Sequence, residues 1–503
     1  MMKIIKSILR TVLPATALLA TMTALAACSE NEDIPVAKEV PQLPDWDDNI
    51  SGEVYDYTVT MAPERPYMHR YDKTMVTKLF MSRPDGQGGS NVGLTFADAL
   101  DVIKGLDNLS RGLPKIVYLI GWQYEGHDCK YPAFHQFNEA LKRPEDATAR
   151  ESYLWLQQEA KKYNTTVSVH VLLMDGYTDS PLWHEYVKND YLCLDAAGLF
   201  MQRAVYNGLP MYDVNICNEW QKGALQKRLD ELAELANLAD AKTVHFDAFF
   251  GRESPYHGTT VAQMETTMRK VLRYMRNHDI DVTAEFYHNN GERIDPMFGL
   301  QAGAWWMDLT SAERAVLPPT LVSGGREGLF GNNVWSEEAF LFGDNYPAED
   351  DFNWVDLHPE RSWKTAWNSA KLGIATHSIP YMYFNCHKVI EYNSTNKTAT
   401  YSDGLVADFK NLTVTHNGVI LRDHDNTFFP LPWVTDHKEI VAYSKNGYGK
   451  RRWTLPADWA GVTQVSISTV TSDGLENTYT LPVENNTVTL TLDANTMLSI
   501  QPE

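Results

Sequence analysis

The chain has 503 residues, of which 44% are hydrophobic and 11% aromatic, a composition typical of globular proteins that excludes a disordered chain. This length favours two or three domains, one of which can be a barrel of about 250 residues. Acidic residues outnumber basic ones by 65 to 44, for a net charge of −21. Nucleic acid is therefore not expected as a partner, because phosphate contacts need clustered Lys and Arg.

Residues 1–28 have the pattern of an export signal, with three basic residues followed by a long apolar run. The run ends in Leu25-Ala26-Ala27-Cys28, which resembles the bacterial lipobox. The resemblance implies cleavage before Cys28 and lipid attachment to this residue. The acidic run 29–33 resembles the tag that sends some lipoproteins to the outer face of the outer membrane. We therefore expect an outer membrane lipoprotein at the cell surface, held to the membrane by its N-terminal lipid.

Residues 29–52 are polar and contain several prolines, which predicts a flexible tether. Residues 53–112 are interpreted as an N-terminal cap segment that leads into the next domain. Within it, Thr58–Met61 has the pattern of a strand, and Phe96–Leu106 has the pattern of a helix.

Between residues 113 and 400, apolar β-rich runs alternate with amphipathic helical segments, which indicates βα units around a parallel sheet. The pattern predicts a (β/α)8 TIM-like barrel, although the eightfold closure is inferred and not counted. Helices are expected at about 148–162, 219–238 and 261–278. Strands are expected at 115–122, 166–173, 243–247, 281–287, 301–307 and 380–385.

After about residue 400 the helical period disappears and short alternating strands follow. Examples are Glu439–Tyr443, Gln464–Ser468 and Thr487–Leu492, with turns at Asn446-Gly447 and Asp473-Gly474. Residues 401–503 are therefore expected to form an all-β sandwich domain with a structural role.

Four cysteines follow Cys28, at widely separated positions with no short spacing. They are interpreted as mostly buried thiols, although an exported protein can also pair such residues. They are Cys129, Cys193, Cys217 and Cys386.

Two carboxylates fall where a barrel carries its chemistry, at the C-terminal ends of strands. Asp247 closes an apolar strand, and Glu285 lies near the end of the next one. Such a pair suits glycoside hydrolysis, in which one ionised carboxylate attacks the anomeric carbon and one protonated carboxyl serves the leaving oxygen. Taken singly, either acid can also be a structural carboxylate at a strand end.

The loop after the first expected strand reads Trp122-Gln123-Tyr124-Glu125-Gly126-His127-Asp128. A carboxylate on this loop can hold sugar hydroxyls with His127 beside it, although a turning loop is the simpler alternative. His170 lies in the middle of the second expected strand and should point into the barrel, where a lone His is more often core. Trp305 and Trp306 end another strand, and either stacking on a sugar or core packing fits them.

The elements 122–128, Val169–Val171, His245–Asp247 and Ala284–Phe286 together resemble glycoside hydrolase family 101, the endo-α-N-acetylgalactosaminidases, and the related family 129. The resemblance covers about 113–400, and Arg452–Pro456 is similar to the β-domain that follows the barrel in those enzymes.

The family resemblance implies Asp247 as nucleophile and Glu285 as general acid/base of a retaining mechanism. It also implies that His127, Asp128 and His170 contact the terminal sugar, to which Trp306 is added as a candidate stacking residue. The implied substrate is α-linked N-acetylgalactosamine on Ser or Thr in mucin-type O-glycans. This chain is much shorter than the family's known members, so exo action on a single terminal sugar is an open alternative to endo action.

Two further readings compete with glycoside hydrolysis. Five histidines can line the barrel mouth as metal ligands, although the usual His-x-His pair is missing; they are His127, His170, His245, His257 and His288. The chain can also be a surface lipoprotein that binds glycans without cleaving them. No cofactor is required by the favoured reading, and no metal ligands are assigned. A structural Ca²⁺ is compatible with the acidic run Glu349–Asp351, which is more simply a solvated surface.

Overall fold

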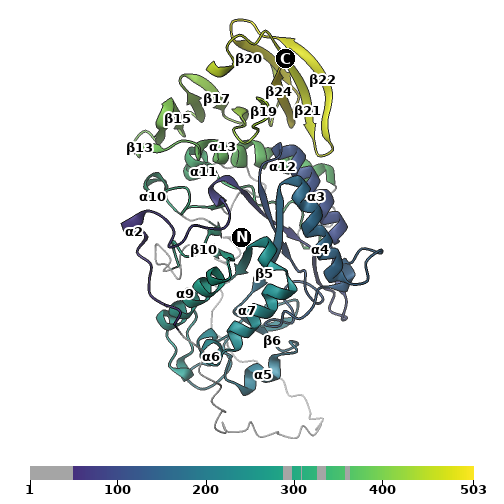
Figure 1. The fold of residues 1–503 in the computed structure, drawn as a ribbon, viewed down its shortest axis with the longest axis vertical. Helices are drawn as coiled ribbons and strands as arrows, with labels where there is room; N and C mark the ends of the chain where they lie inside the picture. Colours follow the sequence, from purple (N-terminus) through teal and green to yellow (C-terminus); the bar gives the residue numbers. More distant parts are fainter. Residues whose placement is uncertain (1–48, 287–296, 307–308, 326–335, 357–362) are drawn as a thin grey trace, which may run out of the picture. The chain divides into compact units, whose positions relative to one another are not determined.

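The computed structural model of the protein describes residues 49–286, 297–306, 309–325, 336–356 and 363–503 (Figure 1). The expected signal segment with Cys28, and most of the expected tether, lie outside these residues. Within the described part of the chain, no helix has both the length and the apolar composition needed to cross a membrane.

A seven-stranded sheet forms the centre of the larger part of the fold, and every neighbouring pair in it is parallel. Figure 1 shows helices such as α3, α4, α7 and α9 around its strands. Parallel strands connected by helices are the basis of (β/α) folds. In sheet order the strands are β1 (Met75–Phe80), β4 (Lys115–Ile120), β5 (Thr165–Leu172), β9 (Thr243–Asp247), β10 (Asp281–Phe286), β11 (Gly303–Trp306) and β12 (Gly324–Gly325).

Strand β1 changes the interpretation of residues 53–112, which were expected to form a cap. All six residues of β1 are buried, and they pair with β4 from Met75 opposite Lys115 to Phe80 opposite Ile120. Helix α3 (Phe96–Ser110), predicted within the same segment, follows β1 and packs against α4. The second half of this segment is therefore the first βα unit of the sheet, and the strand at 115 is the second.

The expected helices at 148–162 and 261–278 are present, because their apolar stripes face the core and their N-termini are capped. The side chain of Thr260 accepts a hydrogen bond from the backbone N–H of Gln263, and the side chain of Gln263 accepts one from the backbone N–H of Thr260. The expected helix 219–238 is broken where Gly223 adopts a φ of +72°. The helices of the region are α4 (Ala149–Ala160), α5 (Trp183–Lys188), α6 (Ile216–Gln221), α7 (Ala224–Leu235), α8 (Leu238–Ala241), α9 (Val261–Asn277), α10 (Ser311–Val316), α11 (Glu337–Phe342), α12 (Trp363–Gly373) and α13 (Ile379–Phe384).

Two predicted strands are wrong. Thr58–Met61 contributes instead to helix α2 (Tyr57–Thr60), since Asp56 caps it by accepting a hydrogen bond from the Thr58 backbone. Residues 380–385 fall largely in α13, which continues α12 through a π-helical segment at Ile374–Ser378. Pro380 is tolerated there because it lies in the first turn of α13.

Residues 344–348 run between the two ends of the sheet. The backbone N–H of Asn345 donates to the carbonyl of Gly324 in β12 at 3.2 Å, and the N–H of Lys78 in β1 donates to the carbonyl of Pro347 at 3.0 Å. This irregular segment, which we call the seam, therefore connects β12 to β1 by backbone hydrogen bonds.

Small antiparallel sheets extend the loops that follow β1 and β5. Strands β2 (Ser82–Pro84) and β3 (Ser90–Val92) pair after β1. Strands β6 (Asp175–Tyr177), β7 (Gln202–Tyr206) and β8 (Leu209–Asp213) form a three-stranded sheet after β5, with β8 in the centre.

The C-terminal region is a ten-stranded antiparallel sheet that begins at β13, slightly earlier than the expected boundary at 401. A two-stranded sheet, β20–β23, packs on it through Trp453, whose ring stacks on Phe428 at 5.0 Å. The strands are β13 (Val389–Asn393), β14 (Thr398–Tyr401), β15 (Leu405–Asp408), β16 (Thr413–His416), β17 (Val419–Asp423), β18 (Asn426–Pro430), β19 (Ile440–Ser444), β20 (Tyr448–Thr454), β21 (Gln464–Thr471), β22 (Gly474–Pro482), β23 (Thr487–Leu492) and β24 (Thr496–Pro502).

The four cysteines that the structure describes are unpaired, and three of them are buried. The pattern agrees with the expectation of scattered thiols. The exposed one is Cys386.

Candidate active site

Asp247 and Glu285 lie side by side at the carboxyl ends of neighbouring strands. Asp247 is the last residue of β9, and Glu285 follows Ala284 of β10, which pairs with Phe246. The backbone N–H of Ala248 donates to Oε2 of Glu285 at 3.3 Å. Both carboxyl groups are largely shielded from solvent, with side-chain exposures of 14% and 11%. The arrangement places two carboxyl groups in one mouth, as predicted.

Two histidines face the Asp247 carboxylate. Nε2 of His170 on β5 is 3.3 Å from Oδ2 of Asp247, and Nε2 of His127 is 4.0 Å from the same oxygen. The two imidazole rings meet edge to face at 5.3 Å. His170 thus points into the barrel as predicted, and the structure brings the four residues Asp247, Glu285, His127 and His170 into one cluster, called here the acid–histidine cluster.

Lys78, in the middle of β1, provides a positive charge next to this cluster. Its side chain is only 1% exposed, and its Nζ lies 3.7 Å from Oε1 of Glu285 and 3.8 Å from Oε2 of Glu349. The same ammonium lies 4.2 Å from the centre of the Trp305 ring, a cation–π distance. Neither Lys78 nor Glu349 was predicted as a site residue. A lone Lys within the buried run Met75–Phe80 is the signal that could have identified it.

The surroundings give the two catalytic candidates opposite protonation states. Burial and the nearby charge of Asp247 raise the pKa of Glu285 well above its usual range, although Lys78 opposes this. Burial also acts to raise the pKa of Asp247, but the contacts with His170 and the protonated Glu285 outweigh it and hold that pKa well below its usual range. The two pKa values are thus shifted in opposite directions, which favours an ionised Asp247 beside a protonated Glu285.

The predicted sugar contacts His127 and Asp128 lie on the loop after β4. Nε2 of His127 is 3.4 Å from Oδ1 of Asp128, and Nη1 of Arg83 donates to Oδ2 of Asp128 at 3.1 Å. Burial raises the pKa of Asp128 to about 7 despite Arg83. Burial and the neighbouring His170 lower the pKa of His127 well below its usual range, so this imidazole is neutral at pH 7. The loop therefore presents polar groups that can donate to or accept from sugar hydroxyls.

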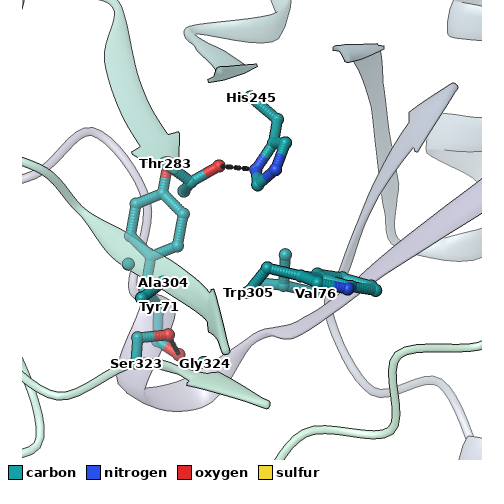
Figure 2. A pocket seen from close by; sticks show the side chains of 9 residues that line it. Tyr71, Val76, His245, Thr283, Ala304, Trp305, Ser323 and Gly324 are labelled. Carbon is teal, nitrogen blue, oxygen red and sulfur yellow. Dashed lines mark hydrogen bonds between the residues drawn. The ribbon is translucent and has the colours of Figure 1, made fainter. Parts of the chain in front are cut away.

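Figure 2 shows a pocket on the inner side of His245, among the side chains of Tyr71, Thr283 and Trp305. Nδ1 of His245 and Oγ1 of Thr283 are hydrogen-bonded at 2.9 Å. The cavity measures about 10 Å³, which is the size of one water molecule and too small for a sugar. This cavity therefore does not accommodate a sugar ring.

A metal ion is the other group that this region can hold. Within the described residues, His170, His245 and Glu285 each offer a ligand atom, and these atoms lie within 4.8 Å of one another. His257 was also considered as a metal ligand. Its Nδ1 is instead hydrogen-bonded to the hydroxyl of Ser254 at 2.7 Å. His288 lies outside the described residues.

Other sequence-predicted residues fall elsewhere. Glu125 lies 3.9 Å from Lys130 and is not part of the acid–histidine cluster. Trp306 ends β11, but its side chain lies outside the described part of the structure. In the acidic run, Glu349 is directed to Lys78, and Asp351 accepts a hydrogen bond from Tyr346 at 2.7 Å.

Comparison with known families gives a match over residues 70–295 to the family described as Endo-alpha-N-acetylgalactosaminidase, glycoside hydrolase family 101. The match includes β1 through β10 and with them the whole acid–histidine cluster. No curated protein sequence matches the chain.

Among solved structures, the chain is similar to the α-N-acetylgalactosaminidase NagBb from Bifidobacterium bifidum. The quadruple mutant of that protein aligns with a TM-score of 0.50 at 12% identity, over 68% of this chain and 57% of NagBb. Its GalNAc complex aligns with a TM-score of 0.49 at 13% identity, over 69% of this chain and 58% of NagBb. An α-amylase from Anoxybacillus aligns with a TM-score of 0.44 at 10% identity, over 86% of this chain and 99% of the amylase. The chain thus spans less than two thirds of the length of NagBb. The TM-score of 0.50 supports a shared fold.

Proposed function

We propose that this chain, a glycoside hydrolase of the family 101 type, cleaves α-linked N-acetylgalactosamine from mucin-type O-glycans with retention of configuration. The observation that carries the proposal is the pair Asp247 and Glu285, which lie side by side at the ends of adjacent strands, where their surroundings shift the two pKa values in opposite directions. The family match over residues 70–295 supports the choice of sugar.

In the first step the Asp247 carboxylate attacks the anomeric carbon and forms an ester bond to it. The bond from that carbon to the leaving oxygen breaks, and the oxygen takes the proton of Glu285. In the second step water attacks the same carbon, Glu285 takes the proton of that water, and the ester bond to Asp247 breaks. The N–H of His170 stabilises the Asp247 carboxylate at a distance of 3.3 Å and keeps it oriented.

The test uses p-nitrophenyl α-N-acetylgalactosaminide and its β1,3-galactosylated disaccharide form as substrates for residues 29–503. We expect hydrolysis of at least one substrate, with the α anomer of the sugar released first in the NMR spectrum. Asp247→Asn and Glu285→Gln should each lower kcat by at least about 10²-fold, with the folded state retained by circular dichroism. First release of the β anomer, or an active Asp247→Asn, contradicts the proposal.

The products also separate endo from exo action. Release of the disaccharide alone indicates an endo enzyme, and release of the monosaccharide alone indicates an exo enzyme. If a glycan array shows binding while neither substrate is cleaved, the chain is a non-catalytic glycan-binding lipoprotein.

A metal-dependent hydrolase is the second candidate, because His170, His245 and Glu285 offer ligand atoms within 4.8 Å of one another. Activity that is lost in a chelator and restored by one divalent cation supports this candidate. The proposed retaining mechanism requires no cofactor, so it predicts unchanged rates in the chelator.

We also propose how the parallel sheet closes and how the C-terminal sheets are arranged. The parallel sheet closes into an eight-position barrel with the seam at 344–348 in the eighth position, supported by the bonds from Asn345 and Lys78. The C-terminal sheets form a β-sandwich.

The chain is anchored in the outer membrane by lipid on Cys28, with its catalytic part at the cell surface. Cys28→Ala should move the protein from the membrane to the soluble fraction.

A further inference from the structure

The hairpin formed by β7 and β8 ends in a tight turn that the sequence analysis did not predict. Tyr206 pairs with Leu209, and the two residues between them, Asn207 and Gly208, have φ values of +51° and +78°. This conformation is typical of a type I′ turn, which an Asn-Gly sequence favours. The tip of the hairpin is therefore well defined by local backbone geometry alone.

Side-chain contacts hold this tip against the loop that carries His127 and Asp128. Nδ2 of Asn207 donates to the backbone carbonyls of His127 at 3.0 Å and Asp128 at 3.3 Å. Nη1 of Arg83 donates to Oδ1 of Asn207 at 3.4 Å and to Oδ2 of Asp128 at 3.1 Å. The hairpin, although inserted after β5, is thus attached to the edge of the candidate active site.

Tyr206 immediately precedes the anchored turn and is 41% exposed. Burial and, after it, the charges of Asp128, Asp175, Asp247 and Glu285 raise the pKa of its hydroxyl to about 12. A tyrosine ring offers a flat apolar face with a polar edge, which is suited to one face of a sugar ring. Val205 is 57% exposed and, as the preceding strand residue, points to the opposite face of the hairpin.

The position of Tyr206 indicates which side of a bound sugar it serves. The leaving oxygen must contact Glu285 on β10, whereas the hairpin is anchored to the loop after β4. In sheet order, β5 and β9 lie between these two strands. The tip of the hairpin is therefore on the side of the sugar away from the leaving group.

We propose that Tyr206 is a stacking platform for a second sugar, linked to the N-acetylgalactosamine on its non-leaving side, and thereby sets the preference for a disaccharide over a monosaccharide. This inference rests on the proposed function and adds to it a specificity-determining residue. Asn207 is the positioning residue that holds the platform in place.

The experiment compares kcat/KM for the monosaccharide and disaccharide p-nitrophenyl substrates in four proteins: wild type, Tyr206→Ala, Tyr206→Phe and Val205→Ala. Loss of the ring should lower kcat/KM for the disaccharide about tenfold and leave the monosaccharide within about twofold. Tyr206→Phe keeps the ring and should retain most of the preference. Val205→Ala removes an exposed side chain of the same hairpin and should change neither substrate.

The outcomes separate this inference from the proposed function. Equal loss on both substrates after Tyr206→Ala, or no loss on the disaccharide, overturns the platform while the proposed function stands. A wild-type enzyme that cleaves only the monosaccharide also overturns the platform. If the wild type cleaves only the disaccharide, a tenfold loss confined to Tyr206→Ala supports it. A wild type that cleaves neither substrate overturns the proposed function, and the platform with it.

Discussion

The ammonium group of Lys78 lies between the carboxyl groups of Glu285 and Glu349 and over the ring of Trp305. A buried positive charge favours the ionised form of any carboxyl group nearby. Lys78 therefore limits how far burial and Asp247 raise the pKa of Glu285. In the proposed mechanism, Lys78 therefore lowers the upper pH limit at which Glu285 still carries the proton for the leaving group.

Replacing Lys78 by Met removes the charge and keeps most of the side-chain volume. The pKa of Glu285 should rise, so the alkaline limb of the kcat/KM–pH profile should move to higher pH. Lys78→Arg keeps the charge and should leave the limb close to its wild-type position. An alkaline limb that stays in place, or moves to lower pH, in Lys78→Met contradicts this role.

His170 acts on the other carboxylate. Its Nε2 lies 3.3 Å from Asp247, and this contact helps to hold the pKa of Asp247 low. His170→Phe should raise that pKa, so the acid limb of the kcat/KM–pH profile should move to higher pH. His257→Phe, at a histidine that bonds to Ser254, is the matched control and should leave the acid limb unchanged. The same displacement in both variants would indicate a general effect of losing a histidine.

Sequence reasoning could place Asp247, Glu285 and His170 together because the ends of parallel strands meet at one mouth. It could not place Lys78, since the run that carries it was interpreted as part of a cap. Glu349 follows the seam, which has no strand-like alternation, and Tyr206 lies on an inserted hairpin whose contact with the Asp128 loop is long-range. These residues reach the site through tertiary contacts that a local pattern does not contain.

At the scale of elements, the loop after β4 depends on a glycine that passes close to another part of the backbone. Gly126 has a φ of +131°, and a Cβ there would lie 2.6 Å from backbone atoms of Ser82 and Arg83. The N–H of His127 donates to the carbonyl of Ser82 at 2.9 Å, so this close approach fixes the position of His127.

Gly126→Ala should displace the loop and lower kcat/KM by about 10²-fold, because misplacement of a substrate contact by about 1 Å has that effect. Gly86→Ala is the control: its φ of +75° is also unfavourable for alanine, but no atom lies within 4 Å of the added carbon. Both variants should lose stability through backbone strain, and only Gly126→Ala should lose most of its activity. Equal kinetics in the two variants would contradict a positioning role for the loop.

The helices at 149–160 and 261–277 were predictable because amphipathic period and capping residues agree there. The segment 380–385 was mistaken for a strand because its aromatic residues favour strands in general. Its helical state depends on α12, which extends into it through the π-helical turn. Local preference and tertiary context conflict at that point, and tertiary context decides the structure.

At the scale of the whole molecule, an ion pair joins helix α3 to the C-terminal sheet. Nε of Arg111, at the end of α3, lies 2.6 Å from Oε1 of Glu439, whose side chain is 1% exposed. Ser499 of β24 also donates to Glu439 at 2.6 Å. The Glu439 carboxylate is buried at the boundary of the two regions, where Arg111 is its guanidinium partner and Nε2 of His437 lies 3.1 Å from its Oε2.

Arg111→Ala should leave that carboxylate buried without its guanidinium partner, with only His437 and Ser499 beside it, and lower the free energy of unfolding by about 3 kcal/mol. Arg451→Ala breaks the more exposed pair with Asp423 and should cost less than about 1 kcal/mol. Urea unfolding followed by tryptophan fluorescence and by circular dichroism measures both. A loss no larger for Arg111→Ala than for Arg451→Ala would show that the Glu439 contact contributes little to stability.

The seam has a further consequence for motion. The N–H of Lys78 that bonds to Pro347 belongs to the same residue whose ammonium adjusts Glu285. Where a segment is held by few backbone bonds, local opening costs less free energy than global unfolding. Native-state hydrogen exchange should therefore find the Lys78 and Asn345 amides less protected than those of the β4–β5 pair. Each opening event would break the bond from Lys78 to Pro347 and expose this amide to solvent, while β1 stays paired with β4 and keeps the Lys78 side chain in the site.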